Sequence, residues 1–314
     1  MSMTSLLDAA DVAVDDEHTP VRRRRYDNGD FGRPVRLRST SVLGWAGDIL
    51  ATFGVIIVLF VVWMLGWSNV ESSRAQSEAA QNMEQRWASA DPVKDNSLDS
   101  AATPGDMRAL TSGEAFAYIH IPAFGADWKR AVVEGVDHNS LAIGPGHYPG
   151  SQLPGQRGNT AFAGHRDGQG APFSEIDSLD TCAPVVVETR DRWLVYRVLP
   201  TSATSSDDYV SRASQCVGSS VSSRLGSMQY SGLRGKEIIS PSQTSVVAPV
   251  PGHDDIAPED AQMPILTLTS CHPMYSNAQR IVIHAVLSQE TLKSEQPDGW
   301  TPPALNGAPS EVSG

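Results

Sequence analysis

The chain has 314 residues, 36 of them acidic and 24 basic, which gives a formal net charge of −12 at pH 7. That length suits one or two domains with a hydrophobic core of ordinary size. The basic residues form no stripe outside the N-terminal region, so the composition argues against a nucleic-acid partner.

The N-terminal part of the chain is organised around a membrane. Residues 1–42 are first acidic and then arginine-rich, and we expect them to be disordered. We expect a transmembrane helix over residues 43–67, because residues 49–67 carry no charge. A run of that length spans about 28 Å at about 1.5 Å per residue, which matches a hydrocarbon core of about 30 Å.

The arginines upstream of this run predict its orientation. Seven of them precede the apolar residues: Arg22, Arg23, Arg24, Arg25, Arg33, Arg36 and Arg38. Because a positively charged flank stays on the cytoplasmic side, we expect a single-pass cell-membrane protein with a cytoplasmic N-terminus and an extracytoplasmic remainder. A cleaved signal peptide is the alternative, but its apolar region is usually only about 7–15 residues long.

The remaining segments divide into a stalk, a β-rich domain and a tail. Residues 68–112 are polar and small, and they predict an extracytoplasmic stalk with one short helix at residues 78–87. A Ser-rich stretch at residues 201–236 interrupts the domain that begins near residue 113. Residues 289–314 are rich in Pro, Gly, Ser and Glu, and they predict a disordered tail.

Short β-branched runs recur through the domain, and turn-rich pieces separate them. The eight expected strands cover residues 116–121, 131–136, 160–163, 184–189, 193–199, 245–250, 265–270 and 280–287. This many short strands with few helical stretches predicts an all-β fold, either a small closed barrel or a sandwich.

Two of these strands place reactive side chains at one end of a sheet. Cys271 closes the run that starts at Pro264, and Arg280 opens the run that ends at Leu287. A thiol beside a fixed positive charge suits acyl transfer through a thioester. Taken alone, a cysteine at a strand end is more often a small buried hydrophobic residue.

A nucleophilic thiol also needs a base, and His165 is the best placed of the eight histidines. It follows a small-residue strand that ends in Gly164, so its imidazole projects from a strand end as the thiol does. The three cysteines all lie in the expected extracytoplasmic part. If Cys271 is the nucleophile, Cys182 and Cys216 are the pair left to form a disulfide; two unpaired thiols are the alternative.

These residues resemble the signature of the sortases, cysteine transpeptidases of Gram-positive cell walls. That signature is Thr-Leu-x-Thr-Cys before a loop and an Arg, with a His about a hundred residues upstream; this chain reads TLTSCHPMYSNAQR at 267–280. The resemblance extends to the actinobacterial class E branch and covers most of residues 115–288. Its segments are AYIHIPAFGADW (117–128), VVEGV (132–136), IGPGHYPG (143–150), LPGQRGNTAFAGHR (153–166), APFSEIDSL (171–179), PVVVETRDRWLVYRV (184–198) and VVAPVPG (246–252).

The resemblance implies an eight-stranded sortase-type β-barrel over residues 113–288 and a mechanism without a cofactor. It implies that Cys271 attacks an LAxTG-like sorting signal between Thr and Gly, that Arg280 stabilises the oxyanion, and that His165 transfers the protons. The implied partners are exported proteins with a C-terminal sorting signal and a lipid-linked peptidoglycan precursor that supplies the amine.

The resemblance also implies a set of substrate-binding residues. Ser270 replaces the usual Thr but keeps a hydroxyl for the substrate, and His147 and Tyr148 lie in a segment expected to line the groove. The Ser-rich insertion lies where sortases border that groove, so it bears on specificity or is a plain surface excursion.

Two other function classes remain open. One is a Cys/His protease or wall hydrolase that cleaves without transfer, and the other is an inactive wall-binding scaffold. No Cys-x₂-Cys or His-x₃-His pattern is present, so we expect no metal site.

Overall fold

The computed structural model describes residues 42–89, 110–226 and 229–306, without the side chains of residues 42–43 and 64–69. The expected arginine-rich tail, apart from residue 42, therefore lies outside the described residues, as do residues 90–109 of the stalk and residues 307–314. The chain divides into two compact units, Met1–Val55 and Ile56–Gly314.

The first helix, α1, spans Val42–Ser89, which makes it far longer than the membrane segment alone. Its stretch Gly44–Trp63 has a mean hydropathy of 2.3 and the length of a membrane span. Side chains in this stretch are exposed in the structure, as lipid-facing residues would be. One apolar helix with these properties fits a single-pass anchor.

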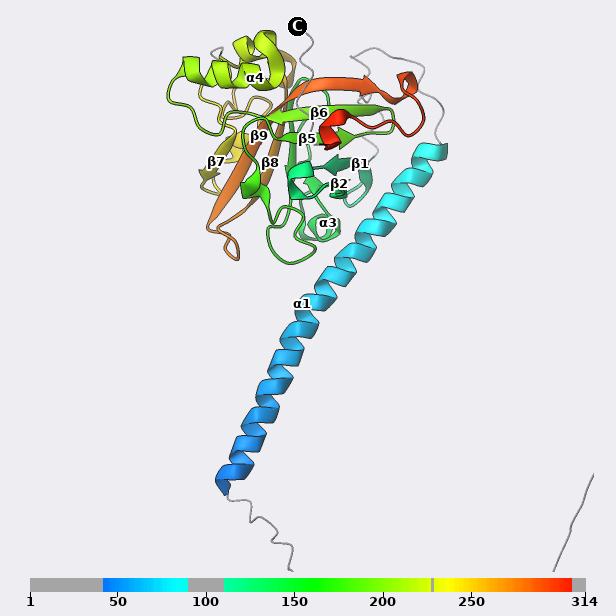
Figure 1. Ribbon diagram of the computed structural model, residues 1–314, viewed down its shortest axis with the longest axis vertical. Helices are drawn as coiled ribbons and strands as arrows, with labels where there is room; N and C mark the ends of the chain where they lie inside the picture. The colour runs from blue at the N-terminus through cyan, green and yellow to red at the C-terminus, as the bar shows by residue number, and fades with distance from the viewer. Residues whose placement is uncertain (1–41, 90–109, 227–228, 307–314) are drawn as a thin grey trace, which may run out of the picture. The chain divides into compact units, whose positions relative to one another are not determined.

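The second unit is built on a closed β-barrel (Figure 1). Its strands are β1 (Ala115–His120), β2 (Lys129–Glu134), β3 (Gly146–His147), β4 (Gly158–Ala163), β5 (Pro184–Glu188), β6 (Arg192–Val198), β7 (Lys236–Ile239), β8 (Pro264–His272) and β9 (Gln279–Leu292). The order is β6-β5-β1-β2-β3-β4-β8-β9-β7, and a further β6–β9 pairing closes a ring of eight strands, with β7 beside the first half of β9. The predicted eight-stranded sortase-type barrel is confirmed.

One of the eight expected strands is wrong. Residues 245–250 contain a 3-10 helix, Thr244–Val247, in place of a strand. Pro249 and Pro251 flank Val250 and lack the amide hydrogen that a strand ladder needs, so this apolar run cannot pair through its full length. The two-residue β3 completes the ring instead.

Alternation along the strands fills the barrel. Leu266 and Leu268 of β8 and Ile281 and Ile283 of β9 point into the central core, where Phe162 of β4 joins them. The intervening residues of β8 and β9 therefore face the other side. On that side, Ile265 and Val286 pack beneath a second apolar cluster that includes residues of α4 (Ser206–Leu225).

The described residues 68–89 of the expected stalk belong to α1, and the short helix expected at residues 78–87 lies within it. The second half of α1 packs on β1 and β2 through Met83, which is fully buried. Gln76 donates to the carbonyls of Ala131 (3.2 Å) and Ile143 (2.9 Å) and accepts from the amide of Ala131. Small residues at helical spacing make this close approach possible, which a count of polar residues does not reveal.

The expected disordered tail is also wrong for residues 289–306. Strand β9 continues to Leu292, where it pairs with Arg192 of β6. Beyond it a short helix, Pro303–Asn306, buries Ala304 against Trp193, and Trp300 and Leu305 pack beside it. A few apolar side chains in a Pro- and Gly-rich stretch are enough to hold it on the barrel.

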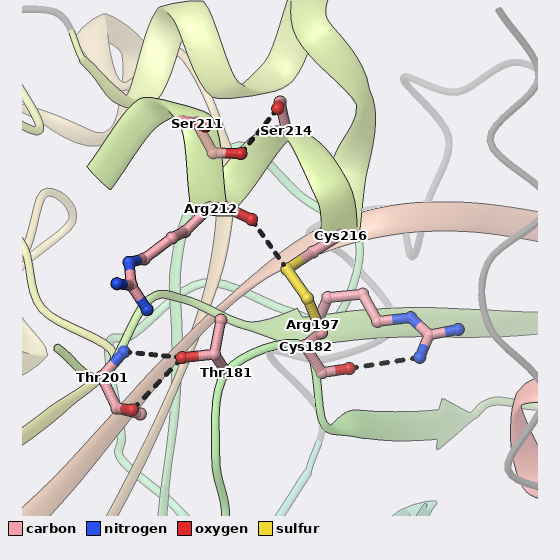
Figure 2. Close-up of a disulfide and its surroundings, with 8 residues drawn as sticks. All are labelled: Thr181, Cys182, Arg197, Thr201, Ser211, Arg212, Ser214 and Cys216. Atoms are coloured by element: carbon pink, nitrogen blue, oxygen red, sulfur yellow. Dashed lines mark hydrogen bonds between the residues drawn. A yellow bond between two sulfur atoms is a disulfide. The ribbon is translucent and has the colours of Figure 1, made fainter. Parts of the chain in front are cut away.

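The Ser-rich insertion folds as helix α4, which bends at Gly218 (φ 79°). Ser205 caps its N-terminus by accepting from the amide of Asp208. Figure 2 shows the disulfide between Cys216 of α4 and Cys182, the turn residue before β5. In the same view Arg197 of β6 donates to the carbonyl of Cys182 (3.2 Å), so the disulfide fastens the insertion to the barrel wall.

Candidate active site

The nucleophile and the cation come from adjacent antiparallel strands. Cys271 near the end of β8 is the direct register partner of Arg280 near the start of β9. Their neighbours Ser270 and Ile281 are also paired, so the two side chains leave the ladder at the same rim of the barrel. Cys271 is half-buried and is the free cysteine of the three.

His165 reaches the same rim through a parallel pairing. Strand β4 pairs with β8 up to Ala163 and Thr269, and Gly164 continues the ladder by donating to the carbonyl of Thr269 (3.1 Å). His165 and Cys271 each lie two residues beyond the last paired positions, Ala163 and Thr269. The strand pairings therefore bring the backbone positions of Cys271, His165 and Arg280 to one rim of the barrel.

The environment of His165 favours the neutral imidazole. Burial lowers the pKa of His165 below its ordinary value, and the charge of His138 adds to this, while Asp167 and Gln169 act in the opposite direction. Its Nε2 atom is buried and has no hydrogen-bond partner within the described residues. In the free protein this imidazole is therefore positioned as a neutral group that has an uncommitted nitrogen.

Arg280 is held by the loop between β8 and β9. Its Nη1 atom donates to the carbonyls of Asn277 and Gln279, both at 2.9 Å. These two bonds use one nitrogen of a guanidinium that carries five N–H donors. The remaining donors are available for a substrate carbonyl or a developing oxyanion at this rim.

Several contacts join the segment around His165 to the segment around Cys271, and these residues were not predicted as part of the site. Arg166 is 4% exposed, and its Nη1 atom lies 3.1 Å from Nδ1 of His272 while its Nη2 atom lies 2.9 Å from Asp177. Asp167 accepts from the amide of Tyr275 (2.7 Å). In the sequence, the one indication of such a role is that Arg166 and His272 directly follow His165 and Cys271 and that Asp167 follows Arg166. Nothing in the sequence indicates Asp177 or Tyr275.

In the structure the side chains of Ser270 and His147, both expected to bind substrate, are engaged by the protein itself. The Ser270 hydroxyl is buried and donates to the carbonyl of Gly164 (2.8 Å), so it ties β8 to β4. His147 is 2% exposed; its Nδ1 atom lies 2.7 Å from Glu134 and its Nε2 atom lies 2.8 Å from Ser151. Both ring nitrogens serve the fold, and the partner Glu134 could not be identified from spacing.

Tyr148 lies nearer the expected groove. Its hydroxyl is 2.9 Å from that of Thr269, two residues before Cys271. Its side chain also lines a surface pocket of about 310 Å³ whose other wall is the loop before β8, including Thr244, Val247 and Pro249. Asn159 supports that loop by donating to the carbonyls of Val246 (3.1 Å) and Ala248 (3.0 Å).

The residues that the structure describes contain no group of three or more His, Cys, Asp or Glu side chains that could hold a metal ion.

Comparison with known proteins gives consistent matches. Residues 119–288 match the family model described as "Sortase domain". The chain is 27% identical to sortase SrtE1 of Streptomyces coelicolor over 80% of this chain and 59% of that protein. It is 29% identical to sortase SrtE2 of the same organism, over 86% of this chain and 90% of that protein.

A solved structure agrees with these matches. The SrtF sortase from Corynebacterium diphtheriae superposes with a TM-score of 0.58 at 36% sequence identity, over 69% of this chain and 98% of that one.

Proposed function

The chain belongs to the sortase family of cysteine transpeptidases, and we propose that it joins exported proteins to the cell wall at the Cys271 rim. Its similarity to two class E sortases makes a C-terminal LAxTG-like signal, cleaved between Thr and Gly, the proposed substrate. The observation that carries the proposal is the register pair of Cys271 with Arg280, next to His165 at the end of the parallel strand β4.

In the proposed first half-reaction, the sulfur of Cys271 attacks the carbonyl carbon of the Thr. His165 takes the proton of the Cys271 thiol as the sulfur attacks, and gives it to the departing amine as the C–N bond to Gly breaks. Arg280 donates to the oxyanion of the tetrahedral intermediate. The product is a thioester between Cys271 and the Thr carboxyl group, and the Gly-containing fragment leaves.

In the proposed second half-reaction, an amine of a peptidoglycan precursor attacks the thioester. His165 takes a proton from that amine, the C–S bond breaks, and a new amide forms. The energy of the cleaved peptide bond is thus kept in the new amide, and no external energy source is needed.

We also propose that the apolar stretch of α1 spans the cell membrane with the N-terminus in the cytoplasm. Its length and hydropathy support a span, and the arginines before it support the orientation. Such an anchor would keep the enzyme on the membrane surface that carries the lipid-linked amine.

The test uses the full chain in detergent micelles, a panel of LAxTG-like peptides and a small amine. Mass spectrometry should detect the peptide joined through its Thr to the amine. The adduct should be absent with Cys271→Ala, His165→Ala and Arg280→Ala, and present with Glu295→Ala, an exposed residue beyond β9. Hydrolysed peptide without adduct would favour the protease or hydrolase function, and no reaction with any peptide would favour the scaffold function.

A further inference from the structure

We infer that Arg166 and His272 form a clamp that positions His165 relative to Cys271, and that Arg166 is a positioning residue of the reaction. This inference rests on the proposed roles of Cys271 and His165. The term clamp is used below for Arg166, His272 and Asp177.

Arg166 and His272 of the clamp directly follow the proposed catalytic residues His165 and Cys271 in the sequence. Side chains alternate along β8, so Leu266 and Leu268 point to the central core, and His272 follows them at the same parity. Cys271 has the opposite parity. Strand β4 ends at Ala163, so the placement of Arg166 follows from its contacts: the residue is 4% exposed and its guanidinium reaches His272 and Asp177. Each proposed catalytic residue is thus followed in the sequence by a clamp residue.

The guanidinium of Arg166 is fixed at two ends. It pairs with Asp177 of the short helix Ile176–Ser178 at 2.9 Å and lies 3.1 Å from Nδ1 of His272. Because a guanidinium only donates, Nδ1 of His272 is the acceptor. A planar fork with two partners restrains orientation as well as distance, which a single point charge would not.

The burial of Arg166 is costly for the fold. The residue is 4% exposed, and its Nε atom is buried without a hydrogen-bond partner in the described part of the chain. A buried unpaired donor destabilises a fold and calls for a specific reason. Two guanidinium nitrogens of Arg166 bond to different elements, and the third, Nε, stays unpaired. This unpaired donor is a cost that we expect where a buried arginine serves to connect two elements.

Two further hydrogen bonds, one on each side of the clamp along the chain, also tie the segment of His165 to the segment of Cys271. Ser270 donates to the carbonyl of Gly164 before the catalytic pair, and Asp167 accepts from Tyr275 after it. The segments are thus tied one residue before and two residues after His165. The clamp links the residues that directly follow His165 and Cys271 through their side chains, so its loss should loosen the alignment of these two segments.

The measurement is the rate at which iodoacetamide alkylates Cys271 as a function of pH, in the full chain in detergent. Cys271 is the free thiol, so the label reports on one site. The reaction follows the thiolate, which a well-placed imidazole supports. The reference variant is His165→Ala, which we expect to slow alkylation near pH 7 by roughly tenfold.

The clamp variants separate positioning from stability. We expect Arg166→Met and His272→Leu to slow alkylation near pH 7 by roughly five- to tenfold, because loss of about an ångström of alignment weakens proton transfer strongly. His272→Gln keeps a carbonyl acceptor for Arg166 and should stay within about twofold of the wild type. Arg192→Gln, which removes another buried arginine that pairs with Asp191 and Glu290, should lower the melting temperature without changing the profile.

Each possible outcome either supports or refutes the clamp, and it shows whether the proposed catalytic roles stand. If His165→Ala leaves the profile unchanged, the proposed catalytic roles fail and the clamp fails with them. If His165→Ala changes it while Arg166→Met and His272→Leu match Arg192→Gln, only the clamp is overturned. Should Arg166→Met not fold, the comparison of His272→Leu with His272→Gln at a half-exposed position gives the answer, since equal rates would refute the clamp.

Discussion

The buried His284 should make the fold sensitive to mild acid. This side chain is 1% exposed, and burial lowers its pKa from 6.5 to about 3. Its Nδ1 atom lies 2.9 Å from the hydroxyl of Thr267, whose hydrogen is donated to Asn159. The hydroxyl therefore accepts from Nδ1, and the ring sits in the core as a neutral donor.

The sign of the effect follows from the lowered pKa. Above pH 6.5 the imidazole is neutral in both states and contributes no pH dependence. Below that pH the unfolded chain takes up a proton that the folded chain refuses until pH falls to about 3, so stability is lost through this window. At about 1.36 kcal/mol per pH unit, the loss between pH 7 and pH 5 is about 2 kcal/mol.

The variant His284→Gln removes the titrating group and keeps an amide that hydrogen-bonds to Thr267. We expect the free energy of unfolding of the wild type to fall by about 2 kcal/mol more than that of His284→Gln between pH 7 and pH 5. The measurement is urea unfolding of the full chain in a non-ionic detergent, with the disulfide intact, followed by far-UV circular dichroism. His253→Gln is the matched control with an exposed histidine.

His165 also contributes to the loss of stability in acid, so its contribution must be measured separately from that of His284. Burial also lowers the pKa of His165, so His165→Gln should reduce the acid sensitivity as well. The reasoning is refuted if His284→Gln and the wild type lose equal stability over this pH range, because His284 would then be accessible to protons in the folded chain.

Three further predictions concern the elements around the site. Gln76→Ala should weaken the docking of α1 by about 1–3 kcal/mol, since two carbonyls and the amide of Ala131 lose their partner, and faster proteolysis near residues 68–89 would detect it. The double variant Cys182→Ser/Cys216→Ser opens a link with a sequence separation of 34 residues and should cost about 3–4 kcal/mol in urea unfolding; an unchanged midpoint would argue against a stabilising role. Asn159→Ala frees the loop before β8 and should raise KM for the peptide roughly tenfold with little change in kcat, whereas a fall in kcat alone would contradict a role in substrate binding.

The strands that carry the site could be predicted because their signal is local. The runs ending in Cys271 and starting at Arg280 are apolar and β-branched, and they are β8 and β9 in the structure. A turn between two such runs predicts an antiparallel pair, which places their adjoining ends together. The pairing of β4 with β8 is different, because about a hundred residues separate the two strands and no local pattern reveals it.

The features that local patterns do not reveal depend on distant partners. The His147 ring is engaged by Glu134, and the Ser270 hydroxyl is engaged by the carbonyl of Gly164. The residues that follow β9 are ordered because Ala304 meets Trp193. In the Ser-rich insertion, apolar residues recur at every fourth position, a helical spacing that the many serines obscure, and they pack in the cluster on the outer face of the barrel: Tyr209, Ala213, Val217, Val221 and Leu225.

The same topology explains why the site lies at one rim. Parallel pairing aligns the ends of β4 and β8, and antiparallel pairing aligns the end of β8 with the start of β9, so the positions at or just beyond these strand ends lie at the same rim. The proposed catalytic residues occupy such positions, and Arg166 and His272, which follow His165 and Cys271 in the sequence, bond to each other there. The proposed clamp would therefore stiffen the site through residues other than the three proposed catalytic ones.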